Sequence, residues 1–128
     1  MRRHLAIFFS GILSLFVLTL PLRAEVQLLM AEEPGCMWCA RWNAEIGPIY
    51  PKTGEGEVAP LRRVDLTKPM PDDVQLNRRV NFTPTFVLLV DGAEVNRIEG
   101  YPGEDFFWGL LGQMLAHAEI PYQIRHSD

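Results

Sequence analysis

The chain has 128 residues, of which 48% are hydrophobic and 22% are charged, so its composition predicts one small globular domain and excludes an intrinsically disordered chain. The formal net charge is −4 at pH 7, and it falls to −7 over residues 25–128, which carry 16 acidic and 9 basic side chains. An acidic domain without a basic stripe binds nucleic acid poorly, so we expect no nucleic-acid partner.

The first 24 residues have the pattern of a secretory signal peptide. A basic start at residues 1–4 precedes an almost wholly apolar run at 5–20, and Ala24 offers a small residue for cleavage. Leu22 stands where a smaller residue is preferred, and the apolar run approaches the roughly 18 residues that span a bilayer. An uncleaved N-terminal anchor is therefore the alternative to the signal peptide at 1–24. Either form leaves the folded domain on the outside of the membrane.

Hydrophobic periodicity predicts four strands and three helices after this segment. The strands are apolar or alternating runs at 25–31, 58–66, 86–90 and 93–99. The helices are runs at 39–50, at 72–80 and at 104–118, of which the first begins near the cysteines and the second is capped by Asp72 or Asp73. The order β-α-β-α-β-β-α predicts the α/β class, with a four-stranded mixed sheet flanked by helices.

Turn-forming residues separate these elements. Gly47-Pro48 should end or kink the first helix, residues 51–56 are predicted to be a turn, and Asp91-Gly92 is a two-residue hairpin turn. The last helix is expected to direct its large apolar side chains inward, namely Phe106, Phe107, Leu110, Leu111, Met114 and Leu115. Residues 119–128 are predicted to be a C-terminal tail, which limits the folded domain to 25–118.

The chain has two cysteines, Cys36 and Cys39, in the stretch AEEPGCMWCARWNAEI. Positions i and i+3 of a helix share a face, so the two thiols can close reversibly into a disulfide. The helix N-terminus favours a thiolate at Cys36, whereas Cys39, one turn further in, is expected to be more buried and to resolve a mixed disulfide. A structural disulfide between such close neighbours constrains the unfolded chain little, which favours a catalytic pair.

A metal site is the alternative interpretation of the two thiols. Zinc sites use three or four protein ligands, and the histidines, His4, His117 and His126, lie far from the cysteines in the sequence. A copper(I) carrier remains open as a hypothesis, with two thiolates as ligands and with Met30 and Met37 as soft neighbours.

These features together resemble the thioredoxin superfamily, over roughly residues 25–118. They are a strand, Cys-x-x-Cys opening a helix, Thr83-Pro84 directly before the apolar run FVLLV, an Asp-Gly hairpin and a closing amphipathic helix. The export signal, the short domain and the Pro-Gly-Cys-Met-aromatic-Cys centre look most like the SoxS type, the periplasmic thioredoxins of bacterial sulfur-oxidation systems. Thioredoxin has an extra N-terminal strand and helix for which this mature chain has no room, so the resemblance implies the minimal, glutaredoxin-like form of the fold.

The resemblance also implies roles for residues outside the cysteine pair. Pro84 should follow a cis peptide bond, and the backbone of Thr83 should pair with an extended client segment whose sulfur lies over Cys36. Trp38, between the cysteines, would shield the disulfide and offer clients an apolar face, or else it is a surface residue that only packs.

One position departs from the superfamily pattern. Thioredoxin carries a buried acid six residues before the first cysteine, and this chain has Met30 there. The candidates for accepting the proton of Cys39 are then Glu32, Glu33 and water. Nothing outside the shared core points to glutathione binding, and no cofactor is expected.

The sequence therefore predicts a periplasmic thiol–disulfide oxidoreductase that reduces a disulfide or mixed disulfide on a client protein, with sulfur-oxidation components as candidate clients. Its electrons would come from a membrane thiol-reductant carrier, because the periplasm is otherwise kept oxidising. We expect the protein to be a monomer. The alternatives are a disulfide-forming oxidant of the same fold and the copper(I) carrier.

Overall fold

The computed structural model describes residues 20–124. Its elements, in chain order, are β1 (Val26–Glu32), α1 (Met37–Glu45), the 3-10 helix η1 (Tyr50–Lys52), α2 (Gly54–Val58), β2 (Leu61–Asp65), β3 (Thr85–Val90), β4 (Ala93–Glu99) and α3 (Glu104–His117). Almost all of the predicted signal peptide, residues 1–19, lies outside the described residues. Within the described residues, no helix has the length and apolar character needed to cross a membrane.

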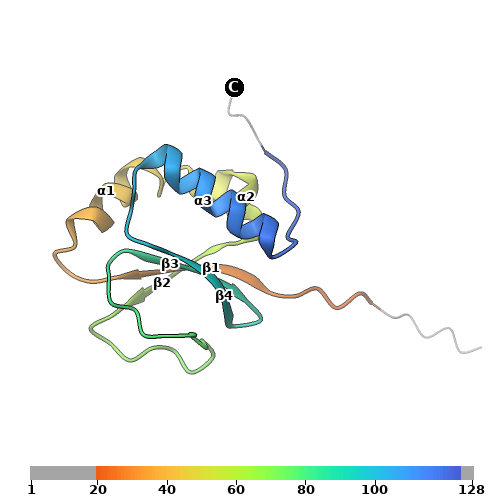
Figure 1. The fold of residues 1–128 in the computed structure, drawn as a ribbon, viewed down its shortest axis with the longest axis horizontal. Helices are drawn as coiled ribbons and strands as arrows, with labels where there is room; N and C mark the ends of the chain where they lie inside the picture. Colours follow the sequence, from red (N-terminus) through yellow and green to blue (C-terminus); the bar gives the residue numbers. More distant parts are fainter. Residues whose placement is uncertain (1–19, 125–128) are drawn as a thin grey trace, which may run out of the picture.

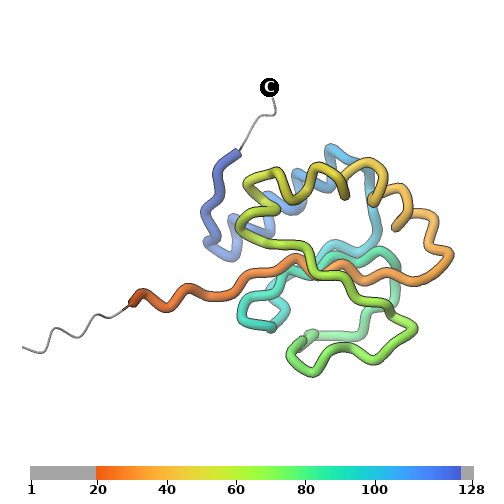
Figure 2. Tube along the Cα trace, turned by 180° about the vertical axis from the view of Figure 1, so that it is seen from behind, coloured from red at the N-terminus to blue at the C-terminus, as the bar shows by residue number. Residues whose placement is uncertain are grey.

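The four strands form one mixed sheet in the order β2-β1-β3-β4. β1 pairs in parallel with β2 and antiparallel with β3, and β3 and β4 form an antiparallel hairpin. The helices α1, α2 and α3 all lie over one face of this sheet (Figure 1, Figure 2). The α/β class and the four-stranded mixed sheet flanked by helices are therefore confirmed.

The main core lies between this face of the sheet and the helices. Successive side chains of a strand point to opposite faces, so alternate residues of β1 and β3 contribute to it, namely Leu28, Met30, Phe86 and Leu88. Trp42 of α1 is fully buried among them, with its ring centroid 5.2 Å from that of Phe86 and 5.6 Å from that of Phe107. This aromatic cluster joins α1 and α3 to the sheet.

The opposite face of the sheet is covered by the long segment 66–84 (Figure 1). A second, smaller core forms there from Leu29, Val74, Val87 and Leu89, with Val64, Met70 and Leu76 packed against it. The helix predicted at 72–80 is wrong, because Gln75 instead pairs with Ala93 of β4 and its backbone exchanges hydrogen bonds with Gly92 and Glu94. The predicted order β-α-β-α-β-β-α therefore loses its second helix.

The turn predicted at 51–56 is also wrong, because η1 and α2 occupy most of this stretch. Thr53 caps α2, and its Oγ1 accepts a hydrogen bond from the backbone N–H of Gly56 at 3.0 Å. Two of the five residues of α2 are glycines. Because glycine has a low helix propensity, the sequence pattern does not indicate a helix here. The first predicted helix ends at Glu45, just before Gly47-Pro48, the pair that was predicted to end or kink it.

The C-terminal part of the domain follows the prediction closely. The hairpin turn at Asp91-Gly92 has both residues at positive φ, 51° and 80°, as a two-residue type I′ turn requires. α3 buries Phe107, Leu111, Met114 and Leu115.

Two side chains of α3 that were predicted to point inward, Phe106 and Leu110, are exposed instead. Phe106 is 71% exposed and Leu110 is also exposed, because the buried stripe of a helix covers only part of its circumference. The predicted tail is partly packed, since Ile120 and Tyr122 lie against the core.

Candidate active site

The ends of three strands meet at one edge of the sheet. Glu32, which ends β1, pairs with Asp65, which ends β2, and Ala31 pairs with Thr85, which begins β3. The loops that continue from these residues carry the cysteines, the start of segment 66–84 and the Thr83-Pro84 step. The parts of the chain that the sequence analysis singled out therefore converge at this edge.

Cys36 and Cys39 form a disulfide at the N-terminus of α1, with their Cα atoms 5.2 Å apart. Cys36 is the N-cap residue, and its Sγ accepts a hydrogen bond from the backbone N–H of Cys39 at 3.1 Å. This hydrogen bond and the positive end of the helix dipole stabilise negative charge on Cys36 when the disulfide is reduced. Cys39 is only 4% exposed, whereas Cys36 is partly exposed, so Cys36 offers the sulfur that a partner can reach.

Two large apolar side chains project into solvent from the first turn of α1. Met37 is 76% exposed and Trp38 is 49% exposed. The guanidinium of Arg41 lies 5.5 Å from the ring centroid of Trp38, so one ring face is occupied by this cation. The structure thus places Trp38 on the surface, while Trp42 belongs to the core.

The helix that carries the cysteines is tied to the turn after β4. The hydroxyl of Tyr101 donates a hydrogen bond to the carboxylate of Glu45, and Arg41 Nε donates to the same carboxylate at 2.8 Å. The hydrogen bond from Tyr101, followed by that from Arg41, lowers the pKa of Glu45 below its ordinary value. Tyr101 itself is buried, so it holds α1 through this hydrogen bond and is not part of an exposed client-binding surface.

Thr83 and Pro84 lie directly before β3. The Thr83–Pro84 peptide bond is cis, as the resemblance implied. The hydroxyl of Thr83 donates to Oε1 of Glu33 at 3.0 Å, which links this loop to the loop before Cys36. Phe82, the preceding residue, has an exposed side chain. Pro84 is buried and Thr83 is partly exposed, so the backbone at Thr83 is the accessible part of this step.

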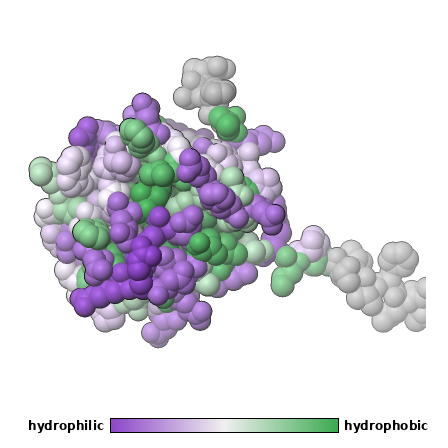
Figure 3. Space-filling model, in the orientation of Figure 1, coloured by the Kyte–Doolittle hydropathy of each residue, from purple (hydrophilic) through white to green (hydrophobic). Residues whose placement is uncertain are grey.

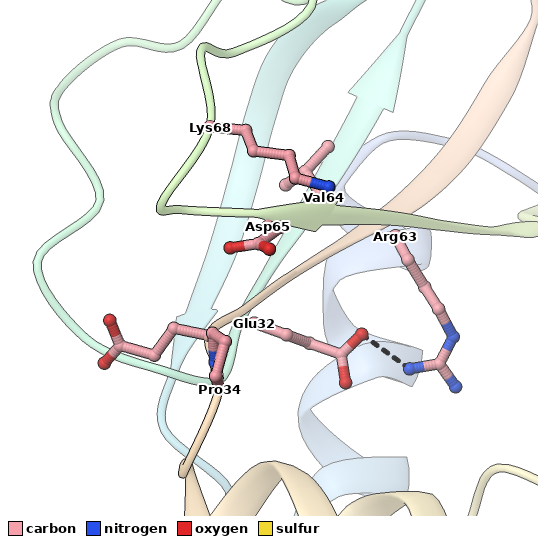
Figure 4. Close-up of a pocket in the computed structure, with 7 residues that line it drawn as sticks. Glu32, Pro34, Arg63, Val64, Asp65 and Lys68 are labelled. Carbon is pink, nitrogen blue, oxygen red and sulfur yellow. Dashed lines mark hydrogen bonds and ion pairs between the residues drawn. The ribbon is translucent and has the colours of Figure 1, made fainter.

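The position of the superfamily's buried acid is filled by the fully buried side chain of Met30. Glu32, two residues later, accepts hydrogen bonds from Arg63 Nη1 at 2.7 Å and from Asn43 Nδ2 at 3.0 Å. Arg63 also donates to Asn43 Oδ1 at 2.8 Å, which closes a three-residue network. Figure 4 shows the ion pair between Glu32 and Arg63 at the border of a pocket of about 480 Å³, with Asp65 on the neighbouring strand.

The two soft neighbours of the copper(I) hypothesis, Met30 and Met37, have different environments. The sulfur of Met30 is buried and lies 3.7 Å from Nη1 of Arg63, while Met37 projects into solvent. Within residues 20–124, no group of three or more His, Cys, Asp or Glu side chains could hold a metal ion.

Sequence reasoning missed a buried ion pair between Glu94 and Arg97 on β4, whose side chains are 2% and 4% exposed. Residues three apart in a regular strand point to opposite faces. A register shift between Leu88 and Leu89 places Val95 as an extra residue in β4, so Glu94 and Arg97 share a face. The charged residues were visible in the sequence, but the bulge was not.

The comparisons with known proteins agree with this geometry. The periplasmic thioredoxin SoxS from Paracoccus pantotrophus, in its reduced form, is 53% identical to this chain and superposes with a TM-score of 0.72, covering 73% of this chain and 99% of its own. Thioredoxin-2 of a malaria parasite, at 20% identity and a TM-score of 0.51, covers 72% of this chain and 85% of its own and shares the fold. No protein-family model and no curated protein sequence matches the chain.

The alignment with SoxS covers nearly all of that protein. This chain also carries the Cys36–Cys39 pair at a helix N-terminus. The fold is the thioredoxin-like fold of both structures. A cysteine pair of this kind in this fold catalyses thiol–disulfide exchange. The chain therefore belongs to the thioredoxin superfamily, as a thiol–disulfide oxidoreductase related to periplasmic thioredoxin SoxS.

Proposed function

We propose that the protein is a periplasmic reductase of client disulfides, with Cys36 as the nucleophile and Cys39 as the resolving thiol. The observation that carries the proposal is the difference between the two sulfurs. Cys36 is partly exposed and its Sγ accepts a backbone N–H, whereas Cys39 is buried one turn further along α1. The resemblance of the sequence to thioredoxins of sulfur-oxidation systems favours clients among the components of such systems, and the 53% identity to periplasmic thioredoxin SoxS supports this resemblance.

The exchange proceeds in two steps. The thiolate of Cys36 attacks one sulfur of the client disulfide, a bond forms between Cys36 and that sulfur, and the second client sulfur leaves as a thiolate that takes up a proton. The thiolate of Cys39 then attacks the Cys36 sulfur, which releases the first client sulfur as a thiol. Two electrons pass from the Cys36–Cys39 dithiol to the client, and the disulfide seen in the structure is the oxidised product.

Glu32 is the acid that we propose as acceptor of the Cys39 proton, through an intervening water. Cys39 and Asn43 are four positions apart on α1 and share a helix face, and Asn43 holds the carboxylate of Glu32 at 3.0 Å. Arg63 keeps this carboxylate beside a positive charge. The other candidate, Glu33, already accepts the hydroxyl of Thr83.

The client segment is proposed to lie along Thr83 in an extended conformation and to pair with its backbone. The partly exposed Thr83 and the half-exposed Trp38 support this placement. The client's reactive sulfur would then approach Cys36 from the solvent side, with Trp38 contributing apolar contact area and Pro84 fixing the loop.

Export with cleavage after Ala24 is proposed for the N-terminus. Residues 20–25 are exposed, and the backbone nitrogen of Glu25 lies 2.8 Å from Oδ1 of Asp91. Cleavage would turn this nitrogen into an ammonium group that pairs with the Asp91 carboxylate. Mass spectrometry of the protein recovered from the periplasm tests this, since a mature chain that retains residues 1–24 would instead indicate a membrane anchor.

The protein is proposed to act as a monomer that a membrane thiol-reductant carrier recharges. Hydrophobic side chains on the face shown in Figure 3 form small patches separated by hydrophilic residues, which supports a monomer. Sedimentation tests the monomer. Loss of the reduced form in cells that lack such a carrier tests the electron source.

The first experiment measures the reduction potential of the Cys36–Cys39 pair in defined thiol buffers. A value near thioredoxin's, about −270 mV, is expected for a reductase, and a value near about −120 mV would show a disulfide-forming oxidant instead. In cells, Cys39→Ser should accumulate a mixed disulfide with a client, whereas Cys36→Ser should accumulate none. Normal client reduction by Cys36→Ser would contradict the assignment of the nucleophile.

A further inference from the structure

A groove adjoins Thr83 at the edge of the sheet that carries the disulfide. It has a volume of about 450 Å³, and most of its lining comes from segment 66–84, including Leu66, Lys68, Met70, Leu76, Arg79 and Val80. Glu33, in the loop that leads to Cys36, also lines it. The groove therefore borders both Thr83, where the client segment is proposed to lie, and the loop that leads to Cys36.

Two cations stand at this groove in a domain whose net charge is negative. Lys68 and Arg79 are both exposed, and neither forms a salt bridge within residues 20–124. The carboxylate of Asp65, at the end of β2, interacts electrostatically with Lys68. It already accepts hydrogen bonds from the backbone N–H and the hydroxyl of Thr67. Glu33 accepts the hydroxyl of Thr83. The two cations thus remain available to an anionic group from outside.

The buried ion pair of β4 holds one wall of the groove in place. Arg97 Nη2 donates to the backbone carbonyl of Arg78 at 2.8 Å, and Nη1 donates to that of Arg79 at 3.3 Å. Oε2 of Glu94 accepts the backbone N–H of Asn77 at 2.8 Å. Because these contacts order the backbone before a client arrives, binding costs little additional ordering of the loop.

We propose that this groove selects clients that carry an acidic side chain close to the reactive cysteine. The inference rests on the proposed function, since a client segment extended along Thr83 rises about 3.3 Å per residue and brings positions within about three residues of its cysteine to the groove. The client carboxylate forms charge-assisted hydrogen bonds with Arg79 and Lys68. The methylene groups of the same side chain pack against Met70 and Leu76.

The test compares matched peptide disulfides as substrates for the protein produced from the full chain and reduced beforehand with dithiothreitol. Three peptides differ only at the second residue on each side of the cysteine, which is Glu, Gln or Lys. We expect the Glu peptide to be reduced about three- to tenfold faster than the Lys peptide at low ionic strength. The difference should shrink in about 1 M salt, because exposed charges are then screened.

Charge reversal distinguishes the groove from the overall charge of the protein. The double variant Lys68→Glu/Arg79→Glu should prefer the Lys peptide, and Lys52→Glu, on η1 and away from the groove, should keep the wild-type preference. Lys68 and Arg79 are exposed, so the double variant is expected to fold, which circular dichroism checks.

Equal rates for the three peptides with the wild type, or an unchanged preference in the double variant, would refute the acidic-client groove and leave the reductase function intact. Reduction of none of the peptides, or reduction that survives Cys36→Ser, would refute the proposed function itself. A reversed preference in the double variant with an unchanged preference in Lys52→Glu supports the groove.

Discussion

At the scale of single residues, the Glu94–Arg97 pair is the most buried of the ion pairs within residues 20–124. Burial raises the pKa of Glu94, but the hydrogen bonds from Arg97 and from the backbone N–H of Asn77 outweigh it, so the pKa lies below its ordinary value of 4.5. The Glu94 carboxylate in turn compensates the charge of Arg97, whose guanidinium is nearly inaccessible to water. The two charges therefore have to be considered together.

The pair predicts a specific loss of stability in acid. A carboxylate whose pKa is lowered by folding stabilises the protein above pH 4.5, and this contribution is lost as the pH falls through the lowered pKa. Glu94→Gln should reduce the free energy of unfolding by about 3 kcal/mol at pH 7 and should flatten its decline below pH 4.5. Urea unfolding of both proteins between neutral and acidic pH measures this, and parallel profiles would contradict it.

Glu32 gives the second prediction at this scale, on catalysis. Glu32→Gln keeps a hydrogen-bonding side chain beside Asn43 and Arg63 but removes the proton acceptor. We expect resolution of the mixed disulfide by Cys39 to slow by about tenfold or more, as for loss of a general base, while attack by Cys36 keeps its rate.

Rapid mixing with a client disulfide measures the two steps separately. Glu33→Gln is the matched control, because its carboxylate contacts Thr83 rather than the network around Asn43. An equal effect of the two substitutions on the resolving step would remove Glu32 from this role.

At the scale of elements, α2 and the C-terminal segment depend on close backbone contact. A Cβ atom at Gly54 would lie 1.7 Å from the backbone oxygen of Gln123, which no relaxation of a side chain relieves. Gly54→Ala should therefore displace the segment that carries Tyr122 and destabilise the domain by about 1–3 kcal/mol. Thermal unfolding and hydrogen exchange at residues 119–124 measure the two effects.

Gly109→Ala is the matched control for this prediction. Gly109 lies within α3, and a Cβ atom there would meet no atom within 4 Å apart from its chain neighbours and the backbone of its own helix. The substitution should stabilise the protein by about 0.5–1 kcal/mol, because alanine loses less conformational entropy in a helix. Similar destabilisation by both substitutions would show that the contact with Gln123 is not the cause.

At the scale of the whole molecule, two layers of different construction enclose the sheet. The helices cover one face with a core that includes Trp42, Tyr50, Phe86 and Phe107, and segment 66–84 covers the other with a smaller core. The helix face fixes the cysteines, and the loop face forms the groove beside Thr83. The larger core therefore lies on the helix face, and the groove that we propose to select clients lies on the other face.

The division predicts different outcomes for the two cores. Trp42→Ala removes the side chain that joins α1, β3 and α3, and it should lower the free energy of unfolding by about 3–5 kcal/mol. Leu76→Ala, in the partly buried loop packing, should cost about 1–2 kcal/mol and raise the KM for a client more than it lowers kcat. Denaturant unfolding and steady-state kinetics of the two variants check this contrast.

The sequence by itself determined the features that depend on local pattern. The hairpin turn at Asp91-Gly92 and the strands on either side of it were predicted, because short-range sterics and periodicity specify them. The cis peptide bond before Pro84 was implied by the resemblance to the thioredoxin superfamily. The exposed and buried sulfurs were also predicted correctly, since they follow from positions in the first turn of a helix.

The tertiary structure alone decided the features that depend on distant partners. Segment 66–84 does not form the predicted helix, because the backbone of Gln75 forms hydrogen bonds with the β3–β4 hairpin instead. Arg97 also donates hydrogen bonds to backbone carbonyls of this segment, 18 and 19 positions earlier in the chain. α2 forms with Thr53 as its N-cap despite the low helix propensity of its glycines, and Gly54 leaves room for the backbone of Gln123. Local helix propensity contributes less than about 1 kcal/mol per residue for ordinary residues. Packing and buried hydrogen bonds between residues distant in the sequence therefore outweigh it.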